Sequence, residues 1–473
     1  MHGLKNIISR LSPTRILIVW IAIYAIFMAF TLNNTYPLQG DESFYTVSAA
    51  NMVQTHSYMV PEYFGQLRFQ KPVLTYWIVA ASYKIFGISL WSGRIPPLIL
   101  SCLTLLVVYY LGRLYINDAK FGLFSVFLLS ASFLFVSFSR IAMNEPVLAF
   151  LLTCALYSFA RADSGNTLGN KWLFTGWLCI SLAFTAKGPG ALILPASYAI
   201  YIVINRRRSS PKYLAKLFNP AYILLFALIA SPWYIYNYHC HHDALLAIVK
   251  KESSHVGTSF SPIRFMSHAV FYAYTLLLSI FPFIIFALFR KFRNRITFPH
   301  KLQFPLIFCI ATLFVFIFFV NEHKDRYIYT ILPTLAVITA AALYSSPHLK
   351  KYTAGAVAVS LLLLIIYVSY PVFPRESLKE LVSAYKLKTL PAETLSTYNI
   401  DIRSNGWILL MSGGKAAIDT YSADYIITDE DGLRSIPDAV IAAKSEERTG
   451  LKLDGFKFKI ISKKFFLAQR NVK

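Results

Sequence analysis

Apolar runs of about the length needed to cross a lipid bilayer recur along the first 370 residues of the chain. A transmembrane helix offers about 20 mostly apolar residues to roughly 30 Å of hydrocarbon. The runs lie at 16–33, 95–112, 121–139, 146–161, 172–186, 189–205, 217–237, 267–289, 303–320, 327–345 and 352–370. A soluble domain could not bury so many of them. The sequence therefore predicts an all-α polytopic membrane protein with about eleven transmembrane helices.

The positive charge of the chain points to a membrane and not to nucleic acid. The formal net charge is +23, but residues 1–370 hold 30 Lys and Arg against 10 Asp and Glu, whereas residues 371–473 hold 16 against 13. The excess cations lie in short loops between apolar runs, where orientation signals belong. We therefore expect membrane lipids as partners and no nucleic acid, while the oligomeric state is not predicted.

The short run 73–86 decides the orientation of the chain. If this run lies at the membrane interface and the N-terminus is cytoplasmic, the inside segments carry 19 cations, and their acids are Asp118 and Asp163. If the run crosses the membrane, every later loop inverts and the most basic loops face outward. The positive-inside rule favours the first arrangement, with juxtamembrane helices within residues 40–90.

The tail after Pro371 has a different character. It contains glycine-rich turns at 412–414 and 431–432, many charged residues, and short β-type runs such as 425–428. This pattern predicts a small soluble α/β domain over residues 371–473, after a transmembrane domain over residues 1–370. An odd number of crossings places this domain outside the cytoplasm.

Ionisable residues gather at the outer ends of the predicted spans. Each such group near hydrocarbon costs at least ~2.5 kcal/mol, so its position needs a reason. The outer-face set is Asp41, Glu42, Arg68, Lys71, Arg94, Arg140, Glu145, Lys187, Glu252, Arg264, Glu322, Lys324, Asp325 and Arg326. A transporter would need acids or bases at mid-depth, where this chain has almost none. The pattern predicts a reaction centre at the membrane surface.

The acids and cations of this set allow two interpretations each. Asp41 and Glu145 lie near predicted helix N-termini, where a carboxylate can act as a cap or, alternatively, as a general base or ligand for a cation. Lys71 could extend to lipid headgroups. However, cations on the outer face oppose the orientation rule, and a bound phosphate would explain them.

Histidines of the loop 239–243, together with Glu252 and His255, raise the question of a metal site. Their spacing matches no zinc pattern, and surface histidines are the alternative. We therefore expect no required cofactor and keep a divalent metal at Glu252 and His255 as a hypothesis.

Three motifs in order carry a family resemblance: Gly40-Asp41-Glu42-x-x-Tyr45, Lys71-Pro72-x-Leu74-x-Tyr76-Trp77 and Gly87-x-Ser89-x-Trp91-x-x-Arg94-x-Pro96. Later landmarks are Arg140-x-x-x-Asn144-Glu145, Lys187-Gly188-Pro189 and Lys324-Asp-Arg326-Tyr327. Over roughly residues 15–345 the chain resembles the bacterial aminoarabinose transferases and protein mannosyltransferase-like glycosyltransferases of the GT-C class. The resemblance implies a sugar donor on undecaprenyl phosphate, used at the periplasmic face of a bacterial inner membrane.

The resemblance also implies roles for residues of this chain. Asp41 matches the main catalytic acid, and Glu145 stands where a second acid, often Asp, is expected. Lys71 matches the lysine expected to bind donor phosphate, and the outer-face cations Arg94, Lys324 and Arg326 are predicted to bind the same phosphate because compact positive charge suits it. Acceptor or sugar would be bound by Glu42, Tyr45, Lys187 and Arg264.

The acceptor is the least determined part of this resemblance. Members that modify lipid A usually carry Glu-His-x-x-Arg-Phe, whereas this chain has Glu252-Ser-Ser-His255-Val-Gly257, with the arginine missing or displaced to Arg264. Lipid A or lipopolysaccharide is the expected acceptor, and protein or another envelope glycan is the alternative. A lipid-linked-sugar flippase and a non-catalytic anchoring protein are the alternatives from other classes.

Overall fold

The computed structural model describes residues 12–33, 41–163, 169–205, 210–254, 261–289, 302–369, 394–398, 408–410, 423–436, 439–454 and 457–470, and four single residues at 382, 386, 412 and 416. The chain forms two compact units. The first holds Met1–Ala29, Phe69–Thr75 and Pro97–Ile366, and the second holds Phe30–Arg68, Tyr76–Pro96 and Tyr367–Lys473.

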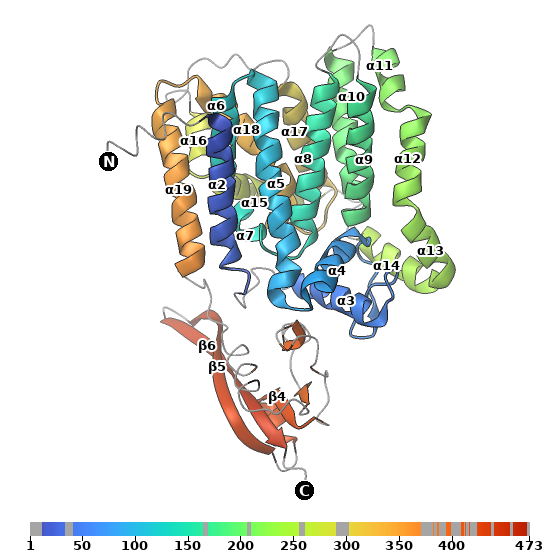
Figure 1. Cartoon of the computed structure of the whole chain (residues 1–473), viewed down its shortest axis with the longest axis vertical. Coiled ribbons are helices and arrows are strands. Elements are labelled where there is room, and N and C mark those ends of the chain that lie inside the picture. Colours follow the sequence, from blue (N-terminus) through green and yellow to red (C-terminus); the bar gives the residue numbers. More distant parts are fainter. Residues whose placement is uncertain are drawn as a thin grey trace. The chain divides into compact units, whose positions relative to one another are not determined.

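The first unit is built from helices, many of which run alongside one another (Figure 1). In chain order they are α2 (Pro13–Ala29), α5 (Leu90–Ile116), α6 (Ala119–Ser130), α7 (Phe133–Phe138), α8 (Asn144–Ala162), α9 (Asn170–Lys187), η1 (Pro189–Leu192), α10 (Ile193–Asn205), α11 (Ser210–Leu217), α12 (Pro220–Ala230), α13 (Pro232–Cys240), α14 (His242–Ser254), α15 (Pro262–Ser279), α16 (Phe283–Leu288), α17 (Gln303–Phe318), η4 (Asp325–Ile331), α18 (Leu332–Tyr344) and α19 (Leu349–Ser369). The residues of α5 up to Pro96 and those of α19 from Tyr367 belong to the second unit.

Each predicted apolar run coincides with one helix or with two consecutive helical segments. Five described helical stretches are long and apolar enough to cross a membrane: Leu90–Ile116, Asn144–Ala162, Ser210–Ala230, Asp325–Tyr344 and Leu349–Ile366. Helices suit this environment because each satisfies its own backbone hydrogen bonds. The mostly helical fold and the multi-pass membrane character are therefore confirmed, whereas the count of eleven crossings stays a prediction.

Polar side chains tie α2 to the helices that follow it in the first unit. The Trp20 indole Nε1 donates to Ser130 Oγ at 3.0 Å, and the Tyr24 hydroxyl donates to Ser139 Oγ at 2.9 Å. All four residues are buried. In a bilayer such interhelical bonds stabilise association by about 0.6 kcal/mol each. They fix the rotation of α2 against α6 and α7.

Two acids next to helix ends form hydrogen bonds with tyrosines of other helices. Asp163 follows the last residue of α8 and accepts from the Tyr201 hydroxyl of α10 at 3.0 Å. Asp118 precedes α6, accepts from the backbone N–H of Lys120 at 2.8 Å and is hydrogen-bonded by the Tyr344 hydroxyl. Since α8 has 19 residues, Asp163 lies about one bilayer thickness from Glu145 at its start.

Helices α8 and α9 approach closely at Gly176. A Cβ on this glycine would lie 2.3 Å from Cε1 of Phe159, whose ring stacks on Tyr198 with centroids 5.1 Å apart. The ring is buried between the two contacts and has little room to move. Only glycine fits this crossing without a shift of one helix.

Replacing Gly176 with alanine should therefore destabilise the protein by about 1–3 kcal/mol, because the added methyl forces Phe159 or a helix to shift. Thermal unfolding in detergent measures this. Gly190→Ala is the matched control, since a Cβ there meets nothing within 4 Å. Equal melting temperatures for the two variants would contradict the close approach.

The second unit contains short elements and a sheet. The elements are α3 (Glu42–Thr55), β1 (Glu62–Tyr63), β2 (Gln66–Leu67) and, from Tyr76 onward, α4 (Leu74–Phe86). The sheet has the order β3-β4-β6-β5, formed by β3 (Leu395–Tyr398), β4 (Tyr425–Asp429), β5 (Ala439–Asp454) and β6 (Lys457–Arg470), with α22 (Glu430–Arg434) after β4. Strands β3 and β4 pair in parallel, and the other pairs are antiparallel.

The predicted strand at 425–428 is confirmed as β4, and 73–86 is a helix, α4. In the sheet's core Leu395, Ile408 and Ile427 pack with Tyr425 and Leu467. In the predicted turn 412–414, Gly413 and Gly414 lie outside the described residues. The domain division at residue 370 stays a prediction.

Candidate active site

The candidate site in the first unit contains the buried carboxylate Glu145. It is the second residue of α8 and is 2% exposed. Its Oε1 accepts from Nζ of Lys187 at 2.9 Å, and Nε of Arg326 lies 3.9 Å away. Lys187 ends α9 and Arg326 lies in η4, so three segments distant in sequence bring one acid and two cations together. A buried carboxylate needs such partners to stay ionised.

A second ion pair adds another cation nearby. Nζ of Lys71 lies 2.6 Å from Oε2 of Glu252, which is close to the end of α14. The Lys71 and Arg326 charges both act on the Lys187 ammonium. We call Lys71, Lys187 and Arg326 the cation group. Its three positive charges face two carboxylates, so an anionic ligand would find a net positive site.

Further contacts join loop ends in the same unit. Nη1 of Arg264 donates to Oδ1 of Asn321 at 2.6 Å, and Nδ2 of Asn321 donates to the carbonyl of Ser254 at 2.7 Å. These bonds connect the start of α15 to the end of α14, two residues from Glu252. Lys324 instead pairs with Glu322 in an exposed salt bridge of 2.9 Å, which stabilises by about 0–1 kcal/mol.

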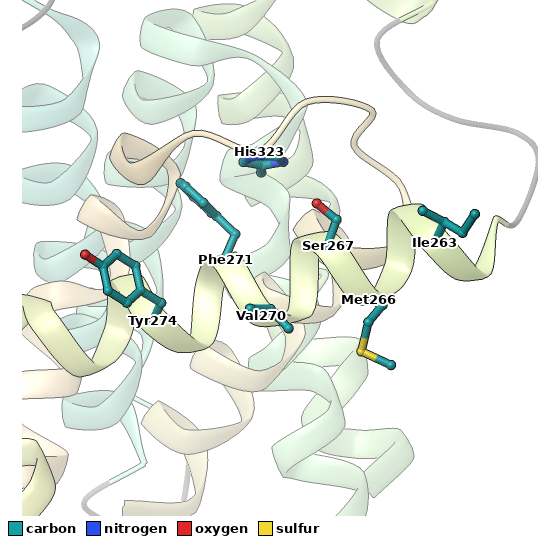
Figure 2. Close-up of a pocket in the computed structure, with 7 residues that line it drawn as sticks. All are labelled: Ile263, Met266, Ser267, Val270, Phe271, Tyr274 and His323. Carbon is teal, nitrogen blue, oxygen red and sulfur yellow. The ribbon is translucent and has the colours of Figure 1, made fainter. Parts of the chain in front are cut away.

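An apolar groove begins beside Arg264. Figure 2 shows its lining along α15, with His323 contributed by the segment before η4. The groove has a volume of about 620 Å³ and is lined by Ile263, Met266, Ser267, Val270, Phe271, Tyr274 and His323. Ile263, at one end of this lining, is the sequence neighbour of Arg264.

In the second unit, Glu42 and Arg94 form a buried bidentate pair. Nε and Nη2 of Arg94 each donate to Glu42 at 2.8 Å, and Nη1 donates to the carbonyl of Leu32 at 3.1 Å. The two side chains are 0% and 1% exposed. Burial raises the pKa of the neighbouring Tyr83 phenol, as does the charge of Glu42, while Arg94 acts in the opposite direction. Three N–H donors of Arg94 thus bond within this unit.

Asp41 immediately precedes α3 and makes no side-chain capping bond to it. The helix-cap alternative for this carboxylate is therefore not observed. Tyr45, on α3, packs its ring 5.2 Å from that of Tyr76. Asp41 and Tyr45 thus lie in the second unit with Glu42 and Arg94, while Glu145, Lys71, Lys187, Arg264, Lys324, Arg326 and Glu252 lie in the first.

The metal hypothesis is not decided by the described residues. His255 lies outside them, and Glu252 pairs with Lys71. Among described residues, no three His, Cys, Asp or Glu side chains gather as metal ligands would. The hypothesis stays a prediction.

Sequence reasoning did not single out Asn321, Tyr83 or Asn144 as site residues. Asn321 links Arg264 to α14, and Tyr83 adjoins the Glu42–Arg94 pair; neither belongs to a recognisable pattern. Asn144 precedes Glu145 in a motif quoted for the family resemblance, so that motif could have identified it as a site residue.

Comparison with known proteins finds relatives that are similar in sequence. Residues 70–236 match the family model described as dolichyl-phosphate-mannose-protein mannosyltransferase. An uncharacterised protein of Aquifex aeolicus is 32% identical over 317 residues, which cover 66% of this chain and 60% of that protein. An Edwardsiella ictaluri protein named undecaprenyl phosphate-alpha-4-amino-4-deoxy-L-arabinose arabinosyl transferase is 26% identical over 219 residues, covering 44% of this chain and 39% of that protein. The chain thus spans well under two thirds of these relatives' lengths.

The fold has a close counterpart among solved structures. The crystal structure of ArnT from Cupriavidus metallidurans bound to undecaprenyl phosphate superposes with a TM-score of 0.72 and 14% sequence identity, covering 97% of this chain and 98% of that one. At this identity the likeness shows the fold. Together with the matched family model and the arabinosyl transferase relatives, it shows that the chain is similar to the GT-C glycosyltransferases of the aminoarabinose transferase and protein mannosyltransferase-like kind.

Proposed function

We propose that the chain transfers a sugar from a polyprenyl-phosphate donor, built on undecaprenyl phosphate, to an acceptor at the outer face of a bacterial inner membrane. One observation supports this most directly: Lys187 and Arg326 lie at helix ends beside the buried carboxylate Glu145, and the charge of Lys71 also acts on Lys187. Such a group fits a phosphate. The names of the arabinosyl transferase relatives and the undecaprenyl phosphate bound to ArnT agree with it.

In this proposal the bond between the sugar's anomeric carbon and the phosphate oxygen breaks, and its electron pair stays on the phosphate. Lys71, which is 29% exposed, is the cation of the group that a ligand can reach, and it stabilises the leaving phosphate. The acceptor oxygen forms the new bond to the anomeric carbon. One displacement of this kind inverts the anomeric centre.

Asp41 is the proposed general base for a hydroxyl acceptor, whose proton it would take. A lipid A phosphate is already anionic and needs no base, so Asp41 and Glu145 would then orient the acceptor or bind a sugar amine. These steps are written without a metal ion, and a divalent cation at Glu252 and His255 is the alternative.

The proposed orientation has a cytoplasmic N-terminus and eleven crossings, with the site and residues 371–473 in the periplasm. Glu145, Lys187 and Arg326 lie at helix ends that this orientation assigns to the outside. Asp118 and Asp163 lie at ends that it assigns to the inside. Labelling of engineered cysteines at these ends in intact cells would test the orientation.

The proposed acceptor is lipid A, which the resemblance to the aminoarabinose transferases implies. Protein or another envelope glycan is the alternative. Purified protein in liposomes, supplied with undecaprenyl-phosphate-linked sugars and with lipid A, peptide or glycan, tests both the activity and the acceptor by mass spectrometry. A mass gain of one sugar on one acceptor supports the proposal. Movement of the labelled lipid across the bilayer without a new glycoside would instead indicate a flippase.

Substituting Asp41 with asparagine should lower kcat for a hydroxyl acceptor by about 10²–10⁴-fold, because the general base is lost. Asp41 makes no side-chain capping bond to α3, so the substitution should leave the stability of α3 unchanged. Steady-state kinetics with a thermal unfolding control measures both effects. Full activity in the purified variant would remove the assigned role.

A further inference from the structure

Asn144 is buried without hydrogen-bond partners. It is 1% exposed, and neither its amide oxygen nor its amide nitrogen has a partner. The neighbouring Glu145 uses Oε1 for Lys187, while its Oε2 has no partner. Two consecutive residues at the start of α8 thus present three unpaired polar atoms.

Such atoms are costly to keep. A buried polar group without a partner destabilises a protein by about 1–3 kcal/mol. Exchanging the amide oxygen and nitrogen does not help, because both positions are unpaired. Most buried polar groups in proteins are satisfied, so this cluster needs a cause outside the described fold.

The chemistry of the three atoms defines what would satisfy them. Oδ1 of Asn144 and Oε2 of Glu145 accept hydrogen bonds, whereas Nδ2 of Asn144 donates. A phosphate offers acceptors only and an ammonium donors only, but a hydroxyl group offers both. Vicinal hydroxyls of a sugar therefore match the set.

The position of Asn144 agrees with this chemistry. Glu145 is bonded to Lys187, on which the charges of Lys71 and Arg326 act. In a sugar phosphate the ring is attached directly to the phosphate oxygen. A ligand whose phosphate is bound by the cation group would thus carry its hydroxyls close to Asn144.

We propose that Asn144, with Oε2 of Glu145, binds hydroxyl groups of the donor sugar and sets sugar specificity. The inference rests on the proposed function, because it takes the sugar to arrive on a polyprenyl phosphate. Asn144 is then a specificity-determining residue that costs stability in the empty protein and contributes to binding when the sugar is present.

The test uses Asn144→Leu, which keeps the side-chain size and removes all polar atoms. Binding of undecaprenyl phosphate is compared with binding of the same lipid bearing 4-amino-4-deoxy-arabinose, mannose or glucose. We define the sugar increment as the dissociation constant of the sugar-free lipid divided by that of the sugar-bearing lipid. In the wild-type protein we expect a sugar increment above one for at least one sugar. In Asn144→Leu this sugar increment should fall about tenfold, while the affinity for the sugar-free lipid should stay unchanged.

Thermal stability gives an independent measurement. Because Asn144→Leu removes unpaired polar atoms, the melting temperature of the ligand-free variant should equal or exceed that of the wild type. Thr153→Val is the matched control on the same helix: Thr153 is buried, and its hydroxyl donates to the carbonyl of Ala149 at 2.6 Å. It should leave the sugar increment unchanged.

Three results would overturn the inference. They are the absence of a sugar increment in the wild type for all three lipids, an unchanged increment in Asn144→Leu, and a melting temperature of Asn144→Leu below that of Thr153→Val. The last would mean that Asn144 is a structural residue, satisfied by a buried water. A sugar increment that depends on Asn144 without any transfer would uphold the inference and refute the proposed glycosyl transfer.

Discussion

Lys71→Ala is expected to lower kcat/KM for the polyprenyl-phosphate donor by about 10²–10³-fold, because the leaving phosphate loses its most accessible cation. The prediction has a matched partner in Glu252→Gln, since both variants break the same 2.6 Å ion pair. If Lys71 binds phosphate, Glu252→Gln keeps transfer within a few-fold of wild type or binds donor more tightly. Measuring kcat/KM of both purified variants in liposomes tests this prediction.

The opposite result has a clear meaning. The side chains of Lys71 and Glu252 are 29% and 33% exposed, so their pair contributes little to stability. Equal losses of activity in the two variants would show that the ion pair itself matters, as a structural link between the segment before α4 and α14. Lys71 would then lose its role in phosphate binding.

Arg94→Met should destabilise the protein by about 3–5 kcal/mol, the largest effect on stability that the structure predicts. The substitution removes two hydrogen bonds of 2.8 Å and the positive charge beside a carboxylate that is 0% exposed, and removing one partner of a buried ion pair is strongly unfavourable. Thermal unfolding of the purified variant in detergent measures the loss.

The double variant Glu42→Gln/Arg94→Met provides the control, because it removes both charges. It should recover at least half of the lost stability, as replacement of a complete buried ion pair usually costs little. The sequence also predicted a phosphate-binding role for Arg94. A stable Arg94→Met protein with weakened donor binding would support that role and contradict the structural one.

The positions of the helices could be predicted from the sequence, because hydrocarbon demands long apolar stretches. The structure divides some of these stretches. The run 121–139 breaks at Ser132, whose hydroxyl accepts from the N–H of Phe135, and 217–237 breaks before Pro232. Proline lacks the N–H that a continuous helix needs, so the second break was readable in advance.

The partners of the charged residues could not be predicted. Glu42 and Arg94 are 52 residues apart, and Lys71 and Glu252 are 181 apart. Their meeting depends on how helices pack, which composition and periodicity do not specify. The sequence did place these groups at span ends, since a charge in mid-membrane is unfavourable. The structure was needed to show which carboxylate each cation contacts.

The tyrosine bonds of Asp118 and Asp163 have a consequence for how the protein lies among lipids. Each carboxylate is bonded to a tyrosine hydroxyl at the end of its helix. In the proposed orientation, Arg113, Lys120, Arg161 and Lys171 lie near these ends on the side of the inner leaflet. Attraction to acidic phospholipids contributes about 1 kcal/mol for each such cation near the surface. In that orientation the two phenols fix the inner helix ends, and the cations beside them attach the same ends to the inner leaflet.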